Sequence, residues 1–127
     1  MVVLDAWALL AYLRDEPASE RIEAEWLGGG AAICLINLGE ALYMRIRERG
    51  SRAARAEVRT IRRRAEVVEA DWDLVRAAAE IKAGGGLSYA DAFCLATAQR
   101  LDAALWTGDP EIIARAKELR CATVNLR

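Results

Sequence analysis

Short apolar runs alternate along this chain with longer stretches in which apolar residues recur every three or four positions. The short runs are typical of buried strands, and the longer periodic stretches are typical of amphipathic helices. The pattern predicts strands over residues 2–4, 31–35, 66–69, 103–106 and 122–126. It predicts helices over residues 6–13, 17–27, 37–49, 51–64, 71–83 and 110–119, and a further helix from residue 88 onward.

Strands that alternate with helices predict βαβ units, in which parallel strands form one sheet and helices cover both of its faces. The expected fold class is therefore α/β, with helices on both sides of a parallel five-stranded sheet. The acids that flank residues 66–69 indicate an edge strand. A chain of 127 residues suits one domain, so residues 1–127 are expected to fold together.

Polar residues mark where several of these helices should begin. Pro17 suits a first helical position, and an aspartate at 71 or 73 suits the start of the helix that follows. Asn37, Ser51 and Ser88 are the expected caps of three more helices. Glu40 and Asp91 lie three residues after Asn37 and Ser88, the spacing of a capping box.

Asp91 has an unusual place for a helix-start residue. Cys94, Leu95 and Ala98, which follow it at helical spacing, are all apolar, so Asp91 stands at the head of the stripe that should face the core. An ionised carboxylate at such a place is costly unless a partner compensates it. Asp91 is therefore a candidate functional residue.

Composition narrows the chemistry that the chain can support. Histidine is absent, which excludes Ser-His-Asp and Cys-His nucleophile systems and zinc sites with histidine ligands. The three cysteines are widely spaced in apolar surroundings and indicate buried thiols in a reducing compartment. No apolar run is long enough to cross a membrane, so the expected location is the cytoplasm. Any catalysis has to rest on carboxylates, with or without a metal ion.

The net charge of −1 conceals an uneven distribution. Nine arginines and two acids lie between residues 45 and 64, a local charge of +7 that leaves −8 on the rest of the chain. Because guanidinium groups suit phosphates, this segment is a candidate for binding RNA, although it also suits an acidic protein segment or a solvated helix face. The candidate binding residues are Arg45, Arg47, Arg49, Arg52 and Arg55.

Four acids occupy equivalent places in the predicted fold. Asp5 and Asp109 follow strands, and Glu40 and Asp91 open helices. The carboxyl ends of parallel strands meet at one edge of a sheet, so these acids should converge there. Each alone is also a good helix-terminus residue, but four converging carboxylates would repel one another unless a cation lay among them. Oxygen ligands suit Mg²⁺ or Mn²⁺, and Asn37 and Thr107 are candidates to orient the ligands.

Four segments that contain these acids resemble the motifs of the PIN-domain ribonucleases, and among them the VapC-like toxins of type II toxin–antitoxin pairs. They are VVLDAWALLAYL, INLGEAL, SYADAFCLATA and LWTGDPEI, in that order along nearly the whole chain. The resemblance implies a three-layer α/β/α PIN-like domain and a Mg²⁺- or Mn²⁺-dependent endoribonuclease. It makes Asp5, Glu40, Asp91 and Asp109 the catalytic and metal-binding acids, with Thr107 in support. It also implies a homodimer and a cognate antitoxin.

One residue departs from the family pattern, and two other functions compete with a nuclease. The family often has a small hydroxyl residue two positions after the first acid, where this chain has Trp7. An alternative is therefore a catalytically inert PIN-like module that binds RNA or protein through its arginines. A phosphoacceptor receiver domain also gathers acids at a sheet edge, but it needs a lysine late in the sheet. Lys82 and Lys117 are the only lysines, and neither follows a predicted strand.

Overall fold

The computed structural model describes residues 1–127 and contains one parallel five-stranded sheet. Its strand order is β3-β2-β1-β4-β5, and every neighbouring pair is parallel. The strands are β1 (Val2–Leu4), β2 (Ala31–Cys34), β3 (Glu66–Val68), β4 (Leu105–Thr107) and β5 (Thr123–Asn125). Each overlaps a predicted strand, and β3 lies at an edge as expected.

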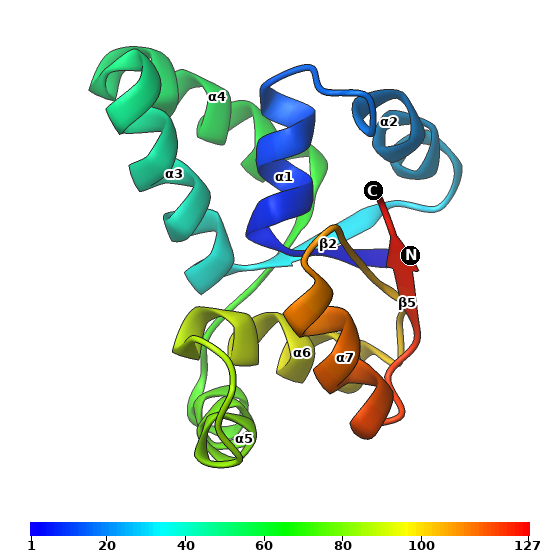
Figure 1. The fold of residues 1–127 in the computed structure, drawn as a ribbon. Coiled ribbons are helices and arrows are strands. Elements are labelled where there is room, and N and C mark those ends of the chain that lie inside the picture. Colours follow the sequence, from blue (N-terminus) through cyan, green and yellow to red (C-terminus); the bar gives the residue numbers. More distant parts are fainter.

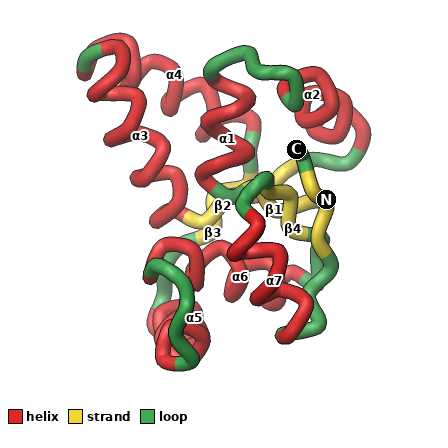
Figure 2. Tube along the Cα trace, in the orientation of Figure 1, coloured by secondary structure: helices red, strands yellow, loops and turns green.

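Helices cover both faces of the sheet, which confirms the three-layer α/β/α architecture (Figures 1 and 2). One face carries α1 (Ala6–Leu13), α2 (Ser19–Gly28), α3 (Leu35–Arg49) and α4 (Ser51–Arg64). The other face carries α5 (Trp72–Ala83), α6 (Tyr89–Leu101) and α7 (Pro110–Glu118). None of these helices has both the length and the apolar character needed to cross a membrane.

Alternating side chains of the central strand hold the three layers together. Val3 points into the core shared with α5, α6 and α7, whereas Val2 and Leu4 point into the core on the opposite face. All three residues of β1 are buried. A strand whose two faces are both covered by helices has apolar residues at every position. Residues 2–4 therefore include no polar residue.

The predicted helix starts are confirmed in part. Ser88 caps α6 by accepting the Asp91 backbone N–H at 3.1 Å, and Asp71 caps α5 by accepting that of Leu74 at 2.9 Å. The prediction that Pro17 opens a helix is wrong, because α2 begins at Ser19.

The expected caps of α3 and α4 are also wrong. Helix α3 begins at Leu35, directly after β2, so Asn37 lies inside the helix and its side chain is free for another role. Ser51 lies within α4, whose cap is Gly50 at a φ of 85°. Only glycine adopts this conformation readily, and it lets the chain turn from α3 into α4 without a loop.

Candidate active site at the edge of the sheet

The crossover direction reverses between β1 and β4, and the candidate site lies where these two neighbouring strands end. From β1 the chain crosses one face toward β2 and β3, and from β3 it returns across the other face to β4. Asp5 directly follows β1, and Thr107 is the last residue of β4. Ligands of open parallel sheets bind at such a switch point, outside the carboxyl ends of the strands.

Asp5 is held rigidly at this point. It is only 2% exposed, and one oxygen, Oδ1, accepts the backbone N–H of Ala8 at 2.7 Å as the cap of α1. The other oxygen, Oδ2, accepts a hydrogen bond from the Thr107 hydroxyl. That hydroxyl also accepts the backbone N–H of Asp109 at 3.0 Å. Thr107 therefore links the acid that follows β1 to the acid that follows β4.

Asn37 joins Glu40 to the residue that precedes Asp91. Its Nδ2 donates to Oε1 of Glu40 at 3.2 Å and to the carbonyl oxygen of Ala90 at 2.9 Å. Ala90 immediately precedes Asp91, so one side chain joins the beginning of α3 to the beginning of α6. Asn37 is 1% exposed, and its Oδ1 has no hydrogen-bond partner. The predicted orienting role of Asn37 thus has a structural basis that does not depend on capping.

Burial and neighbouring charges raise the pKa of three of the four acids. Burial raises the pKa of Asp5 to about 7, assisted by the charges of Asp91 and Asp109 and opposed by the hydrogen bonds from Thr107 and Ala8. Burial also raises the pKa of Asp91, to which Asp109 contributes. The pKa of Glu40 rises for the same reason, with a contribution from Asp91 and opposed by the Asn37 hydrogen bond. The sheet edge therefore gathers all four acids, none of which forms an ion pair.

Two further residues of this edge were not among the predicted site residues. Glu111 lies in the first turn of α7, donates its backbone N–H to Asp109 Oδ1 at 2.9 Å and adds to the rise in the pKa of Asp91. Cys94 donates its thiol to the carbonyl oxygen of Asp91 at 3.0 Å. Burial raises the pKa of this thiol, and the nearby carboxylates raise it further. Glu111 follows Asp-Pro in the sequence, a signal that would have placed it in the first helical turn.

The donor set fits a hard divalent cation in its chemistry, but the side chains are not yet arranged as ligands. Carboxylate oxygens without histidine or thiolate ligands suit Mg²⁺ or Mn²⁺. No three acidic, cysteine or histidine side chains lie close enough together to hold a metal ion as they stand. Both oxygens of Asp5 are already engaged by Ala8 and Thr107. Like-charged acids without a basic partner are nevertheless the electrostatic setting that a bound cation relieves.

Trp7 packs beside this site instead of the small hydroxyl residue that the family often has. A β-carbon on Gly108 would lie 2.3 Å from Cζ2 of the Trp7 indole, so the ring rests directly on the backbone of Gly108. Residue 108 separates Thr107 from Asp109, and Trp7 is two residues from Asp5. The indole therefore packs on the backbone between Thr107 and Asp109, and only glycine at position 108 leaves room for it.

The structure separates the five candidate arginines into two groups. Arg45 is 5% exposed and donates two hydrogen bonds to Glu57, at 3.0 and 2.8 Å, and one to Glu48 at 2.7 Å. It therefore ties α3 to α4 and is not available at the surface. The remaining candidates are exposed on these helices: Arg47, Arg49, Arg52 and Arg55.

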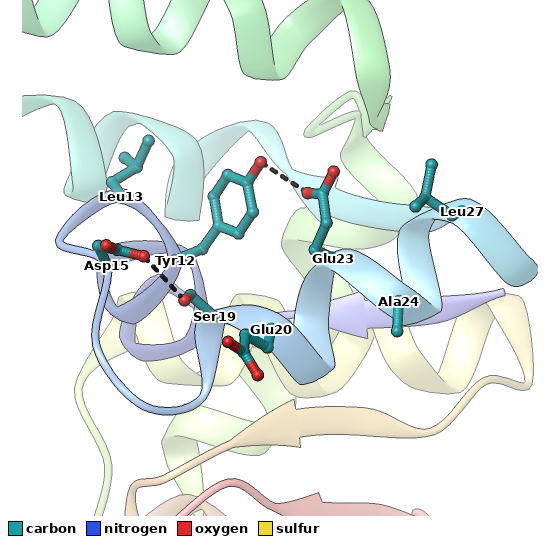
Figure 3. A pocket seen from close by; sticks show the side chains of 8 residues that line it. All are labelled: Tyr12, Leu13, Asp15, Ser19, Glu20, Glu23, Ala24 and Leu27. Atoms are coloured by element: carbon teal, nitrogen blue, oxygen red, sulfur yellow. Dashed lines mark hydrogen bonds between the residues drawn. The ribbon is translucent and has the colours of Figure 1, made fainter.

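A separate hollow of about 590 Å³ lies between α1 and α2 (Figure 3). In it the Tyr12 hydroxyl donates to Oε2 of Glu23 at 2.7 Å, and the Ser19 hydroxyl donates to Oδ1 of Asp15 at 3.2 Å. None of the four acids at the sheet edge lines this hollow. It is thus distinct from the candidate active site.

Comparison with known proteins adds a family and a set of related folds. The family model described as the PIN domain matches residues 2–119. No curated protein sequence matches the chain. A toxin–antitoxin complex from Klebsiella pneumoniae superposes with a TM-score of 0.77 at 17% identity, covering 100% of this chain and 98% of that chain.

Two further solved structures share the fold. DNA-bound VapBC from Salmonella typhimurium gives a TM-score of 0.78 at 17% identity, with 100% of both chains covered. VapC20 from Mycobacterium tuberculosis, a toxin that cleaves the sarcin-ricin loop, gives 0.74 at 20% identity, covering 90% of this chain and 94% of that chain. At these identities the similarity shows the fold.

Proposed function

This chain belongs to the PIN domain family, and from that premise we propose that it is a metal-dependent endoribonuclease and the toxin of a toxin–antitoxin pair. The observation that carries the proposal is the set of four carboxylates at the switch point, none of which has a basic partner. Burial, assisted by neighbouring acids, raises the pKa of three of them, Asp5, Glu40 and Asp91. A purely structural set of helix caps does not need to converge in this way.

In the proposed reaction a phosphodiester bond of RNA is hydrolysed, leaving a 5′-phosphate and a 3′-hydroxyl. Asp5, Glu40, Asp91 and Asp109 would hold Mg²⁺ or Mn²⁺, which supplies an activated water and stabilises the leaving oxygen when bound. Thr107 fixes Asp5 through its hydroxyl, and Asn37 fixes Glu40 through its amide. These two contacts orient the carboxylates before any substrate arrives.

The toxin role draws support from the proteins that share the fold. The Klebsiella structure is a toxin–antitoxin complex, and VapC20 is a toxin that cleaves the sarcin-ricin loop. We propose a cognate antitoxin as partner of this chain, and a homodimer as its assembly. The three free thiols fit a reducing cytoplasm, which is the proposed location.

Cleavage of a structured RNA tests the activity directly. The unsubstituted chain is expected to cut the RNA with Mg²⁺ or Mn²⁺ and to lose the activity in EDTA. Asp91→Asn should reduce the cleavage rate by at least about 100-fold, because it removes a charged ligand without changing the shape of the side chain. The matched control is Asp73→Asn, an exposed aspartate in the first turn of α5, which should cut normally. Equal cleavage by both variants, or full activity in EDTA, would contradict the proposal.

A second candidate function is an inert PIN-like module that binds RNA or protein through its arginines. Two observations favour it: the acids do not form a ready metal site, and Trp7 occupies the space above Gly108. Calorimetric titration with Mn²⁺ separates the two functions. Binding by the unsubstituted chain and its loss in Asp91→Asn support the nuclease, whereas no binding at millimolar Mn²⁺ supports the inert module.

A further inference from the structure

The indole of Trp7 packs against Gly108, in the loop between β4 and α7 on which Asp109 lies. Its six-membered ring lies against Gly108, with Cζ2, Cε2 and Cη2 all within 2.5 Å of where a β-carbon on residue 108 would stand. This contact fixes the ring relative to Thr107 and Asp109, the residues on either side of Gly108. The start of α1 and the loop that leads into α7 are thereby locked together (Figure 1).

Trp7 is not enclosed like a core tryptophan. The residue is half-buried, and its Nε1–H has no hydrogen-bond partner although that atom is not buried. Trp26 provides the contrast, because it is 8% exposed and its Nε1 is fully enclosed. Trp7 therefore leaves part of its ring and an unused hydrogen-bond donor accessible to solvent.

The guanidinium group of Arg127 lies near the Trp7 ring. The guanidinium carbon of Arg127 is 5.9 Å from the centroid of the Trp7 ring, close to the outer limit of a cation–π contact. Arg127 is exposed, so a ligand can displace its side chain. The backbone N–H of Leu126 donates to the carbonyl oxygen of Thr107 at 2.9 Å, which holds this segment beside the end of β4.

We propose that Trp7, supported by Gly108, is the stacking surface for one unpaired nucleobase next to the phosphate at the acidic site, and that Arg127 contacts a phosphate of the same nucleotide. The indole supplies the flat apolar surface that an unstacked base requires. The guanidinium of Arg127, beside the indole, supplies a positive charge that can pair with the phosphate. The inference rests on the proposed function, since it takes RNA as the ligand, and it deepens that function by assigning a residue that selects an unpaired base.

Binding can be measured without cleavage in the Asp91→Asn background. The probes are a six-nucleotide single-stranded oligouridylate and an abasic oligomer of the same length. Each is titrated into the protein once in the presence of Mg²⁺ and once in EDTA. Tryptophan fluorescence should change with the oligouridylate and much less with the abasic oligomer. Trp7→Phe should remove this change while keeping most of the affinity, and Trp7→Leu should weaken binding by roughly 5- to 100-fold.

Two controls separate stacking from general damage to the fold. Trp72→Phe changes an exposed tryptophan on α5 and should leave both the signal and the affinity unchanged. Gly108→Ala should push the indole aside and weaken binding, whereas adding it to Trp7→Leu should have little further effect because the two residues act as one unit.

Equal affinity of Trp7→Leu and the Asp91→Asn parent would overturn the inference, as would a fluorescence change that persists in Trp7→Phe. Failure of the oligouridylate to bind in either condition would overturn it too. None of these results decides whether the unsubstituted chain cleaves RNA, which the nuclease assay measures separately. An inactive chain that still binds the base through Trp7 would leave this inference standing while contradicting the proposed nuclease.

Discussion

Asp5 shows at the scale of one residue how burial of a carboxylate makes stability depend on pH. It is 2% exposed, and burial raises its pKa from 3.8 to about 7 even though Thr107 and Ala8 donate hydrogen bonds to it. Below about pH 4 the group is protonated in both the folded and the unfolded chain. Between pH 4 and 7 the unfolded chain releases a proton that the folded chain retains, so stability falls as pH rises.

This shift predicts that Asp5→Asn becomes favourable relative to the unsubstituted chain as pH rises. In EDTA, the free energy of unfolding of Asp5→Asn minus that of the unsubstituted chain should increase from pH 4 to pH 8. The change should be a few kcal/mol, with a ceiling of roughly 4 kcal/mol set by the pKa shift of about three. Urea denaturation at both pH values measures it. Asp73→Asn serves as control, and a pH-independent difference for Asp5→Asn would contradict the buried, shifted carboxylate.

The sequence predicted some of these residues well because their signals are local. Asp71 and Ser88 cap their helices as expected, since a cap depends only on residues within one turn. Asn37 was expected to cap α3 and to orient ligands, and its contact with Glu40 does follow from their spacing. Its second partner, the carbonyl oxygen of Ala90, lies 53 residues away. No local sequence pattern predicts such a long-range contact.

At the scale of elements, an ion-pair cluster centred on the buried Arg45 joins α3 to α4. Arg45 donates to Glu57 across the two helices and to Glu48 within α3, and Glu48 also pairs with Arg14 at the end of α1. These carboxylates raise the pKa of Arg45, Glu57 foremost. Arg45 was predicted to bind RNA because its neighbours in sequence are basic. Its partner Glu57 lies 12 residues later, on the next helix. Burial of a single arginine within a basic run is not visible in composition.

Arg45→Ala should therefore lower the free energy of unfolding by roughly 2 to 3 kcal/mol, because it removes a buried guanidinium and its three hydrogen bonds to Glu57 and Glu48. The figure is smaller than for a fully enclosed pair, since Glu57 and Glu48 retain access to solvent. Arg52→Ala, an exposed change on α4, should alter stability by less than about 0.5 kcal/mol. Urea denaturation compares the two. Equal effects would mean that the Arg45 cluster contributes nothing beyond an ordinary surface arginine.

The elements themselves were predictable because apolar runs and helical periodicity are properties of short windows. All five strands and seven helices were expected, with boundaries displaced by one or two residues in most cases. Strand order was not predictable in the same way, since it depends on long-range pairing between runs of similar composition. The switch point between β1 and β4 nevertheless follows from the α/β class, and it brought the four acids to one edge.

For the whole molecule, the separation of charge predicts how the affinity for RNA, the proposed substrate, should depend on salt. Arginines lie on the α3–α4 pair, and Asn37 and Glu40 of the proposed acidic site lie near the beginning of α3. Helix α3 has 15 residues and is therefore about 22 Å long. An RNA strand that follows this helix would contact arginines at one end and the acidic site at the other. Contacts of that kind release counterions, so affinity should fall steeply as salt concentration rises.

Arg52 and Arg55 test this arrangement because both are exposed and neither forms an ion pair, hydrogen bond or cation–π contact in the structure. For single-stranded RNA each lost phosphate contact should reduce the slope of log affinity against log salt by about 0.7. Arg52→Gln with Arg55→Gln should therefore reduce it by about 1.4, measured by fluorescence anisotropy in the Asp91→Asn background. Arg76→Gln with Arg120→Gln removes the same charge from exposed positions on α5 and after α7. If both pairs lowered the slope equally, net charge alone would explain binding and the α3–α4 pair would not be the RNA-binding surface.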